Sequence, residues 1–206
     1  MEQEDNMQVA LKDMLGAKTV LVVDDDQEMA ARIAGTLEAR GIEVVLADSV
    51  ERALSELMTD GNDFGLLILD VVLPRTKGEL NDMKAMQTHL QEAVSVIRSL
   101  QHIVTPTRQD LHELRHARDR RAQLRDQIAA KTVCDGGIQI AEELGRQAKA
   151  NPGIAHPPCL FLSALKDTDL QTRARDAYPG KSTWLVKTGL EAVLLDHIRE
   201  LLRPEQ

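Results

Sequence analysis

Val20-Leu21-Val22-Val23-Asp24-Asp25 is the stretch of sequence that decides the fold. A short, mostly β-branched apolar run that stops at carboxylates is typical of a strand buried on both faces of a parallel sheet. Leu66-Leu67-Ile68-Leu69-Asp70 repeats this pattern and also ends in a carboxylate. The two runs therefore predict two buried strands, each with an acidic side chain at its carboxyl end.

Helices and strands alternate around these two runs. Apolar residues repeat every four positions after Asp26, and Ser49 is a helix-capping residue. The predicted helices cover 27–40, 49–60, 137–149, 167–176 and 190–202, and the further strands cover 42–47, 159–163 and 184–186. Alternation of this kind implies right-handed crossovers, and so an α/β fold with a doubly wound parallel sheet.

Residues 79–133 break the alternation and predict a helical hairpin. The first arm has a three-four repeat, and Thr105-Pro106 supplies a cap and a first-turn proline for the second arm. The predicted seam positions are Leu80, Met83, Gln87, Leu90, Val94, Ile97, Gln101 and Val104, then Leu114, Ala117, Arg121, Leu124 and Ile128. We therefore expect an antiparallel two-helix coiled coil inserted into the α/β domain.

Composition narrows the class of protein. The formal net charge of −8 over 206 residues argues against generic binding to nucleic acid or to acidic membranes, which need a basic surface. No apolar run approaches the length of a membrane span, the first residues are acidic, and Cys134 and Cys159 have no zinc-site spacing. We therefore expect a cytoplasmic protein that binds a protein surface or a small cation.

Asp24, Asp25 and Asp70 all fall at the carboxyl ends of predicted strands, where open parallel sheets bind ligands. Carboxylates held close together raise one another's pKa unless a divalent cation compensates their charge. Oxygen ligands favour a hard ion, with Mg²⁺ first. Any one of these aspartates is explained as well by helix capping or by a solvated loop, but the set together favours a metal site.

These motifs resemble, in order and in element, the receiver domain of two-component response regulators. The matching residues are Val22-Val23-Asp24-Asp25, Leu69-Asp70 with Leu73-Pro74, Leu162-Ser163-Ala164 and Val186-Lys187. The resemblance covers about 18–78 and 135–203, and it implies a CheY-like, flavodoxin-like sheet of five strands in the order 2-1-3-4-5. The predicted parts are an extension (1–17), two receiver segments (18–78 and 134–206) and the hairpin (79–133).

The resemblance also implies roles for individual residues. Asp70 occupies the position of the phosphoacceptor, and Lys187 that of the lysine that pairs with the phosphoryl group. Asp24 and Asp25, with Asp70 and the backbone carbonyl of Val72, match the Mg²⁺ ligands. The hydroxyl of Ser163 and the ring of Trp184 match the switch positions. This chain departs from the family at Thr188, which stands where proline is usual.

The predicted function is phosphorelay signalling. A histidine kinase or phosphotransfer protein would donate a phosphoryl group to Asp70, with self-catalysed phosphorylation and dephosphorylation as the only enzymatic activity. No stretch is left for a separate effector domain, so we expect output through protein contact, with the hairpin as the candidate surface. The alternative is a receiver-like scaffold that works without phosphorylation and whose coiled coil mediates dimerisation or docking.

Three features of the second arm have competing interpretations. His112-Glu113-Leu114-Arg115 resembles the phosphoacceptor box of sensor histidine kinases, but the usual threonine and proline do not follow. His112 and His116 have metal-ligand spacing without a third ligand nearby, which favours surface histidines. The arginines of this arm alternate with acidic residues, a pattern that favours a solvated face over a phosphate-binding patch.

Overall fold

The computed structural model describes residues 11–59, 61–103, 105–131, 135–151, 156–164 and 167–204. The helices and strands are β1 (Thr19–Val23), α2 (Gln27–Glu38), β2 (Val44–Ala47), α3 (Val50–Leu57), β3 (Phe64–Asp70), α4 (Lys77–Gln101), α5 (Arg108–Lys131), α6 (Gly136–Ala150), β4 (Cys159–Ser163), α7 (Thr168–Ala177), β5 (Ser182–Val186) and α8 (Leu190–Leu202). The chain divides into two compact units: unit 1 is Met1–Thr76 with Cys134–Gln206, and unit 2 is Lys77–Val133.

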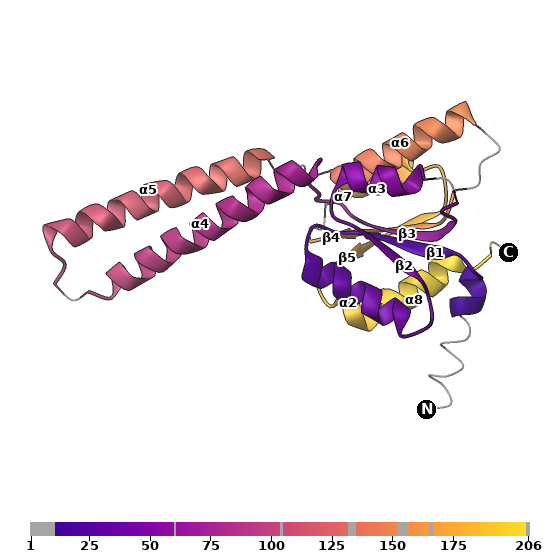
Figure 1. Cartoon of the computed structure of the whole chain (residues 1–206), viewed down its shortest axis with the longest axis horizontal. Helices are drawn as coiled ribbons and strands as arrows, with labels where there is room; N and C mark the ends of the chain where they lie inside the picture. Colours follow the sequence, from indigo (N-terminus) through magenta and orange to yellow (C-terminus); the bar gives the residue numbers. More distant parts are fainter. Residues whose placement is uncertain are drawn as a thin grey trace. The chain divides into compact units, whose positions relative to one another are not determined.

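Unit 1 contains one parallel sheet in the order β2-β1-β3-β4-β5, which confirms the predicted strand order. Helices α3, α6 and α7 cover one face, and α2 and α8 cover the other (Figure 1). Side chains alternate between the faces, so Leu21 and Leu67 join one core cluster while Val22 and Ile68 join the second. Every residue of β3 is buried, as the apolar run predicted.

Local capping residues fix where the helices of unit 1 begin. The side chain of Asp26 accepts hydrogen bonds from the N–H groups of Glu28 and Met29, and the hydroxyl of Ser49 caps α3. Residues 11–15 are helical, and Leu11 and Leu15 are buried in the same core cluster as α2 and α8. This part of the predicted N-terminal extension therefore belongs to the core of unit 1.

Unit 2 consists of α4 and α5, two long helices that lie side by side (Figure 1). Its side chains that are less than a tenth exposed are Ala93, Ile97, Ala117 and Leu124 among the described residues. The predicted seam positions Gln87, Gln101 and Arg121 are exposed, so that part of the prediction is wrong. The half-buried and buried positions of α4 include 86, 90, 93, 94, 97 and 100, so Leu90, Val94 and Ile97 lie where the seam was predicted. Long amides and a guanidinium gain more from solvent than from a narrow seam. The side chains of Leu80, Met83, Val104 and Ile128 lie outside the described residues.

The second long helix begins later than predicted. It starts at Arg108 rather than at Thr105-Pro106. Thr107 Oγ1 accepts the N–H of Asp110 at 3.2 Å, and the Asp110 carboxylate accepts the N–H of Thr107 at 2.7 Å. This reciprocal pair satisfies two donors at the helix start, which fixes the beginning of the helix at this threonine.

None of the helices in the described ranges has the length and apolar composition needed to cross a membrane.

Candidate functional site

The candidate site lies at the carboxyl ends of the strands. Asp70 and Ser163 are the last residues of β3 and β4, while Asp24 and Lys187 directly follow β1 and β5. Backbone pairing continues past the strands, since the N–H of Asp24 donates to Ala47 and that of Lys187 donates to Ser163. Because parallel strands end at the same edge of a sheet, side chains more than 100 positions apart meet there.

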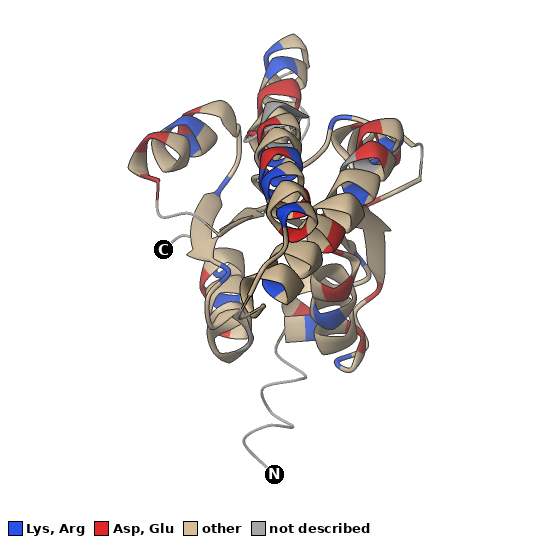
Figure 2. Cartoon of the chain, turned by 90° about the vertical axis from the view of Figure 1, so that its left-hand side faces the viewer, with Lys and Arg blue, Asp and Glu red and all other residues tan. Residues whose placement is uncertain are grey.

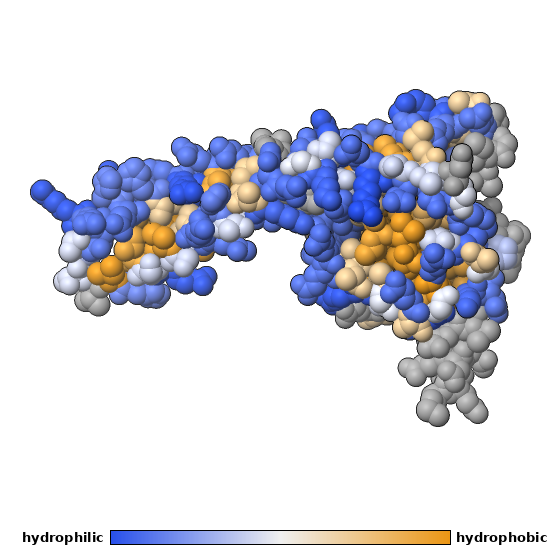
Figure 3. Space-filling model, in the orientation of Figure 1, coloured by the Kyte–Doolittle hydropathy of each residue, from blue (hydrophilic) through white to orange (hydrophobic). Residues whose placement is uncertain are grey.

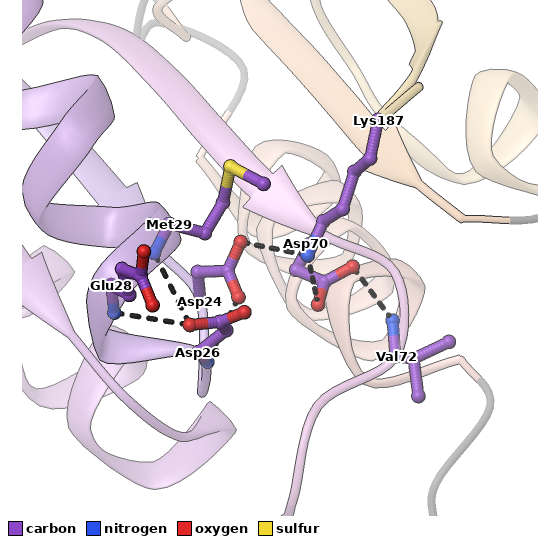
Figure 4. Close-up of polar contacts among 7 residues, drawn as sticks. All are labelled: Asp24, Asp26, Glu28, Met29, Asp70, Val72 and Lys187. Atoms are coloured by element: carbon purple, nitrogen blue, oxygen red, sulfur yellow. Dashed lines mark hydrogen bonds and ion pairs between the residues drawn. The ribbon is translucent and has the colours of Figure 1, made fainter. Parts of the chain in front are cut away.

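Lys187 links two carboxylates. Its Nζ donates to Asp24 Oδ2 and to Asp70 Oδ2, both at 2.8 Å (Figure 4). The side chain of Asp24 is fully buried, that of Asp70 is 6% exposed and that of Lys187 is 17% exposed. Burying carboxylates is costly unless they are paired, and this ammonium group supplies the pairing.

Asp25 completes a group of three carboxylates. One oxygen from each of Asp24, Asp25 and Asp70 lies within 4.8 Å of the others. In the parts of the chain that the structure describes, no other group of three acidic, histidine or cysteine residues has this geometry. Three carboxylates facing one ammonium leave an excess of negative charge, and all the ligand atoms are oxygen. The donor set therefore fits a hard divalent cation such as Mg²⁺.

Backbone N–H groups orient two of these carboxylates. The N–H of Asp26 donates to Asp24 Oδ1 at 3.0 Å, and the N–H of Val72 donates to Asp70 Oδ1 at 3.3 Å (Figure 4). Asp24 and Asp70 thus each accept one hydrogen bond from Lys187 and one from a backbone N–H group. Sequence reasoning gave Asp26 no role in the site, although its position directly before a helix is the signal that would have found it.

Burial dominates the electrostatics of the site. Desolvation raises the pKa of Asp70 to about 7, against the lowering effect of Lys187. Desolvation also raises the pKa of Asp24 and of Asp25, and the neighbouring charge of Asp24 raises that of Asp25 further. Burial by itself lowers the pKa of Lys187, but the charges of Asp70 and Asp24 outweigh it and raise this pKa. The carboxylates thus resist ionisation while the amine remains charged.

The predicted switch residues lie on neighbouring strands. Ser163 is fully buried at the end of β4. Trp184 pairs with Phe161 in the strand register, and their ring centroids are 6.3 Å apart. Its indole Nε1 is buried without a hydrogen-bond partner. Because strand side chains alternate, Trp184 projects from the same face of the sheet as Val186, which pairs with Ser163.

The other residues singled out from the sequence are Val72, Thr188, His112 and His116. Val72 is two residues past Asp70 in the same loop. Thr188 is exposed, and no described peptide bond is cis, so the bond before Thr188 is trans. The rings of His112 and His116 lie on α5 in unit 2 with centroids 4.4 Å apart and planes tilted by 54°, and no described third ligand forms a cluster with them.

Comparisons of sequence relate this chain to known proteins. The family model for the response regulator receiver domain matches residues 20–117. The transcriptional regulatory protein CpxR of Escherichia coli is 41% identical over 71 residues, which are 34% of this chain and 29% of CpxR. The alkaline phosphatase synthesis regulatory protein PhoP of Bacillus subtilis is 38% identical over 61 residues, 30% of this chain and 25% of PhoP. The chain thus matches less than a third of each relative.

Comparisons of structure extend the fold similarity to most of the chain. A CheY-like receiver domain protein from Methanospirillum hungatei has a TM-score of 0.51 at 16% identity, covering 91% of this chain and 94% of that one. The CheX-CheY-BeF3-Mg complex from Borrelia burgdorferi has a TM-score of 0.52 at 14% identity, covering 91% and 90%. At these identities the likeness shows the shared fold.

Proposed function

We propose that this chain, which contains a response-regulator receiver domain, accepts a phosphoryl group on Asp70 from a histidine kinase or phosphotransfer protein. The domain is homologous to the receiver part of CpxR and PhoP, which is consistent with phosphorelay signalling. Receiver domains are generally signalling domains rather than enzymes. The observation that carries the proposal is Lys187 Nζ at 2.8 Å from both Asp24 and Asp70.

The proposed reaction is a phosphoryl transfer to a carboxylate. An Asp70 oxygen forms a P–O bond as the P–N bond of a phosphohistidine breaks, and the leaving imidazole takes up a proton. The carboxylates of Asp24, Asp25 and Asp70, with the carbonyl of Val72, would hold Mg²⁺, which supplies positive charge next to the phosphoryl oxygens. Lys187 moves from its carboxylate partners towards the new dianion, and its charge stabilises the product.

Ser163 and Trp184 form the proposed switch. The hydroxyl of Ser163 would bind a phosphoryl oxygen that exists only after transfer. Its movement would open space beside Phe161, and Trp184 would repack into that space. A new dianion would in this way bias the fold between two arrangements of α7 and β5.

Unit 2 is the proposed output surface, an antiparallel coiled coil inserted between receiver segments 18–78 and 134–206. Apolar side chains reach its surface near the connection between α4 and α5 (Figure 3). Val96, Ile103 and Leu111 are 41%, 38% and 52% exposed. The sequences of both helices contain basic and acidic residues, and Figure 2 shows the two kinds mixed on the end of the chain that faces the viewer. Exposed apolar side chains among mixed charges are suited to binding a protein rather than a polyanion.

The proposal is tested with beryllofluoride, which stands in for a phosphoryl group on a carboxylate, together with Mg²⁺. We expect the fluorescence of Trp184, the only tryptophan, to change. Asp70→Asn should abolish the change completely. Asp176→Asn is the matched control, since this side chain is 70% exposed and pairs with the neighbouring Arg175 on the same helix, so its response should equal that of the unaltered protein.

The alternative function is a scaffold that works without phosphorylation, in which unit 2 mediates dimerisation or docking. The exposed apolar side chains of α4 and α5 favour this scaffold function as much as they favour an output surface. Unchanged Trp184 fluorescence, together with no incorporation of phosphate from acetyl phosphate, would support the scaffold and reject phosphoacceptance.

A further inference from the structure

The start of α6, where the chain returns from unit 2, packs directly against the loop that follows Asp70. The N–H of Gly137 donates to the carbonyl of Val71 at 3.3 Å. A Cβ added at Gly136 would lie 2.6 Å from Leu73 Cβ, and one added at Gly137 would overlap the carbonyl oxygen of Asp70. Neither glycine has a positive φ, so close backbone approach, rather than conformation, is what excludes a side chain here.

The same loop is held from its other side by α3. The carbonyls of Pro74 and Arg75 accept the N–H groups of Val50 and Glu51, at 3.1 and 3.0 Å. These donors are the first residues of α3, whose N–H groups have no partner within the helix. Backbone hydrogen bonds therefore hold residues 70–75 between the start of α3 and the start of α6. Unit 2 begins shortly after this loop, at Lys77.

Asp135 ties the start of α6 to α7. Gln139 Nε2 donates to Asp135 Oδ1 at 2.9 Å. Arg173, on α7, donates through Nη1 to Asp135 Oδ2 and through Nη2 to Glu142 at 2.7 Å. One guanidinium thus joins the carboxylate of Glu142 on α6 to that of Asp135, which directly precedes α6.

We infer that Gly136 and Gly137 are positioning residues for the loop that carries Asp70 and Val72, and that the Arg173–Asp135 pair holds the start of α6, and with it these glycines, against the loop. The inference rests on the proposed function. Because the glycines contact the carbonyl of Asp70 and the backbone of Val71 directly, a displacement of the start of α6 shifts the phosphoacceptor and the proposed metal-ligand carbonyl of Val72.

The first experiment compares Gly137→Ala with Gly35→Ala, whose added Cβ meets no atom within 4 Å. Phosphorylation by acetyl phosphate, Mg²⁺ affinity by calorimetry and the melting temperature are measured on the full chain. We expect Gly137→Ala to slow phosphorylation by about tenfold or more and to weaken Mg²⁺ binding, because a small displacement of the reacting oxygen is costly. Gly35→Ala should leave both unchanged. A folded Gly137→Ala protein with unaltered rate and affinity would overturn the positioning role.

The second experiment tests the Arg173–Asp135 pair, and it also tests the positioning role if Gly137→Ala does not fold. Hydrogen exchange of the loop at 70–75 and of the start of α6 is compared with and without beryllofluoride and Mg²⁺. We expect Arg173→Gln to reduce the beryllofluoride-induced change and Arg173→Lys to restore part of it. Arg146→Gln is the control, since Arg146 is 75% exposed and pairs with Glu143 on its own helix.

Different results would reject the proposed function and the role inferred for Arg173. If the unaltered protein takes up no phosphoryl group and no beryllofluoride, the proposed function fails. If the unaltered protein is phosphorylated and Arg173→Gln responds to beryllofluoride in the same way as the unaltered protein, only the role of the Arg173–Asp135 pair is rejected.

Discussion

Units 1 and 2 use their polar residues in opposite ways. In unit 1, Asp24, Ser49, Asp70 and Ser163 are buried in or beside a core built from five strands. In the described part of unit 2, the side chains that are less than a tenth exposed are all apolar, and its charged residues face solvent. A core with five strands can hold buried charge because apolar burial over the rest of the sheet offsets the cost. The seam between two helices buries too little apolar surface to offset it. Chemistry is thus expected in unit 1 and surface recognition in unit 2.

The largest expected effect is in the core of unit 1. Leu67→Ala removes a fully buried side chain from the central strand, and we expect a loss of about 3 kcal/mol in unfolding free energy. Leu46→Ala is the control on β2, where the side chain is 38% exposed, and should cost under about 1 kcal/mol. Urea unfolding measures both. Equal losses would contradict the contrast between buried and exposed strand positions.

The buried charge of unit 1 should make its stability depend on pH. The pKa of Asp70 is about 7 in the folded protein, against 3.8 without perturbation, so folding binds a proton in this window. The metal-free protein should therefore lose stability as pH rises from about 4 to 7, since the carboxyl group must ionise while buried. At pH 8 we expect Asp70→Asn to be more stable by on the order of 2 kcal/mol.

Urea unfolding at pH 4 and pH 8 in the presence of a chelator measures the difference in stability between Asp70→Asn and the unaltered protein. We expect this difference to vanish at pH 4. At pH 8 it should shrink when Mg²⁺ replaces the chelator. An Asp70→Asn protein that is less stable at pH 8 would show that the attraction of Lys187 outweighs desolvation.

A smaller effect is expected at the start of α5. Thr107→Ala removes the reciprocal cap with Asp110 and should destabilise unit 2 by about 1 kcal/mol. Thr88→Ala is the matched control, because the Thr88 hydroxyl donates only to the carbonyl of Lys84 within α4. Hydrogen exchange of the first turn of α5 should increase in the first variant and stay the same in the second. Faster exchange in unit 1 would contradict the separation of the two units.

The smallest effect tests the corrected seam. Arg121→Ala should change the stability of unit 2 by less than about 0.5 kcal/mol, because Arg121 is exposed. Leu124→Ala, at a side chain that is 8% exposed, should cost about 2 kcal/mol. Thermal unfolding compares the two. A large loss from Arg121→Ala would restore this residue to the seam.

Prediction from sequence succeeded where the signal is local. The apolar runs ending at Asp24 and Asp70 predicted the central strands, and Ser49 predicted a helix start. It was less accurate in the hairpin, where Thr105-Pro106 and Thr107 are both plausible helix starts, and where glutamines and apolar residues share one repeat. The partner helix decides which stripe is buried, and that information is not local.

The amino-acid sequence by itself determined the alternation of strands and helices and the acidic residues at the strand ends, because side-chain periodicity and capping act between residues close in the chain. Only the tertiary structure decided that Lys187 lies between Asp24 and Asp70, and that Gly137 lies against the Asp70 carbonyl. Such contacts depend on how the strands and helices pack in three dimensions, which no short window of residues encodes.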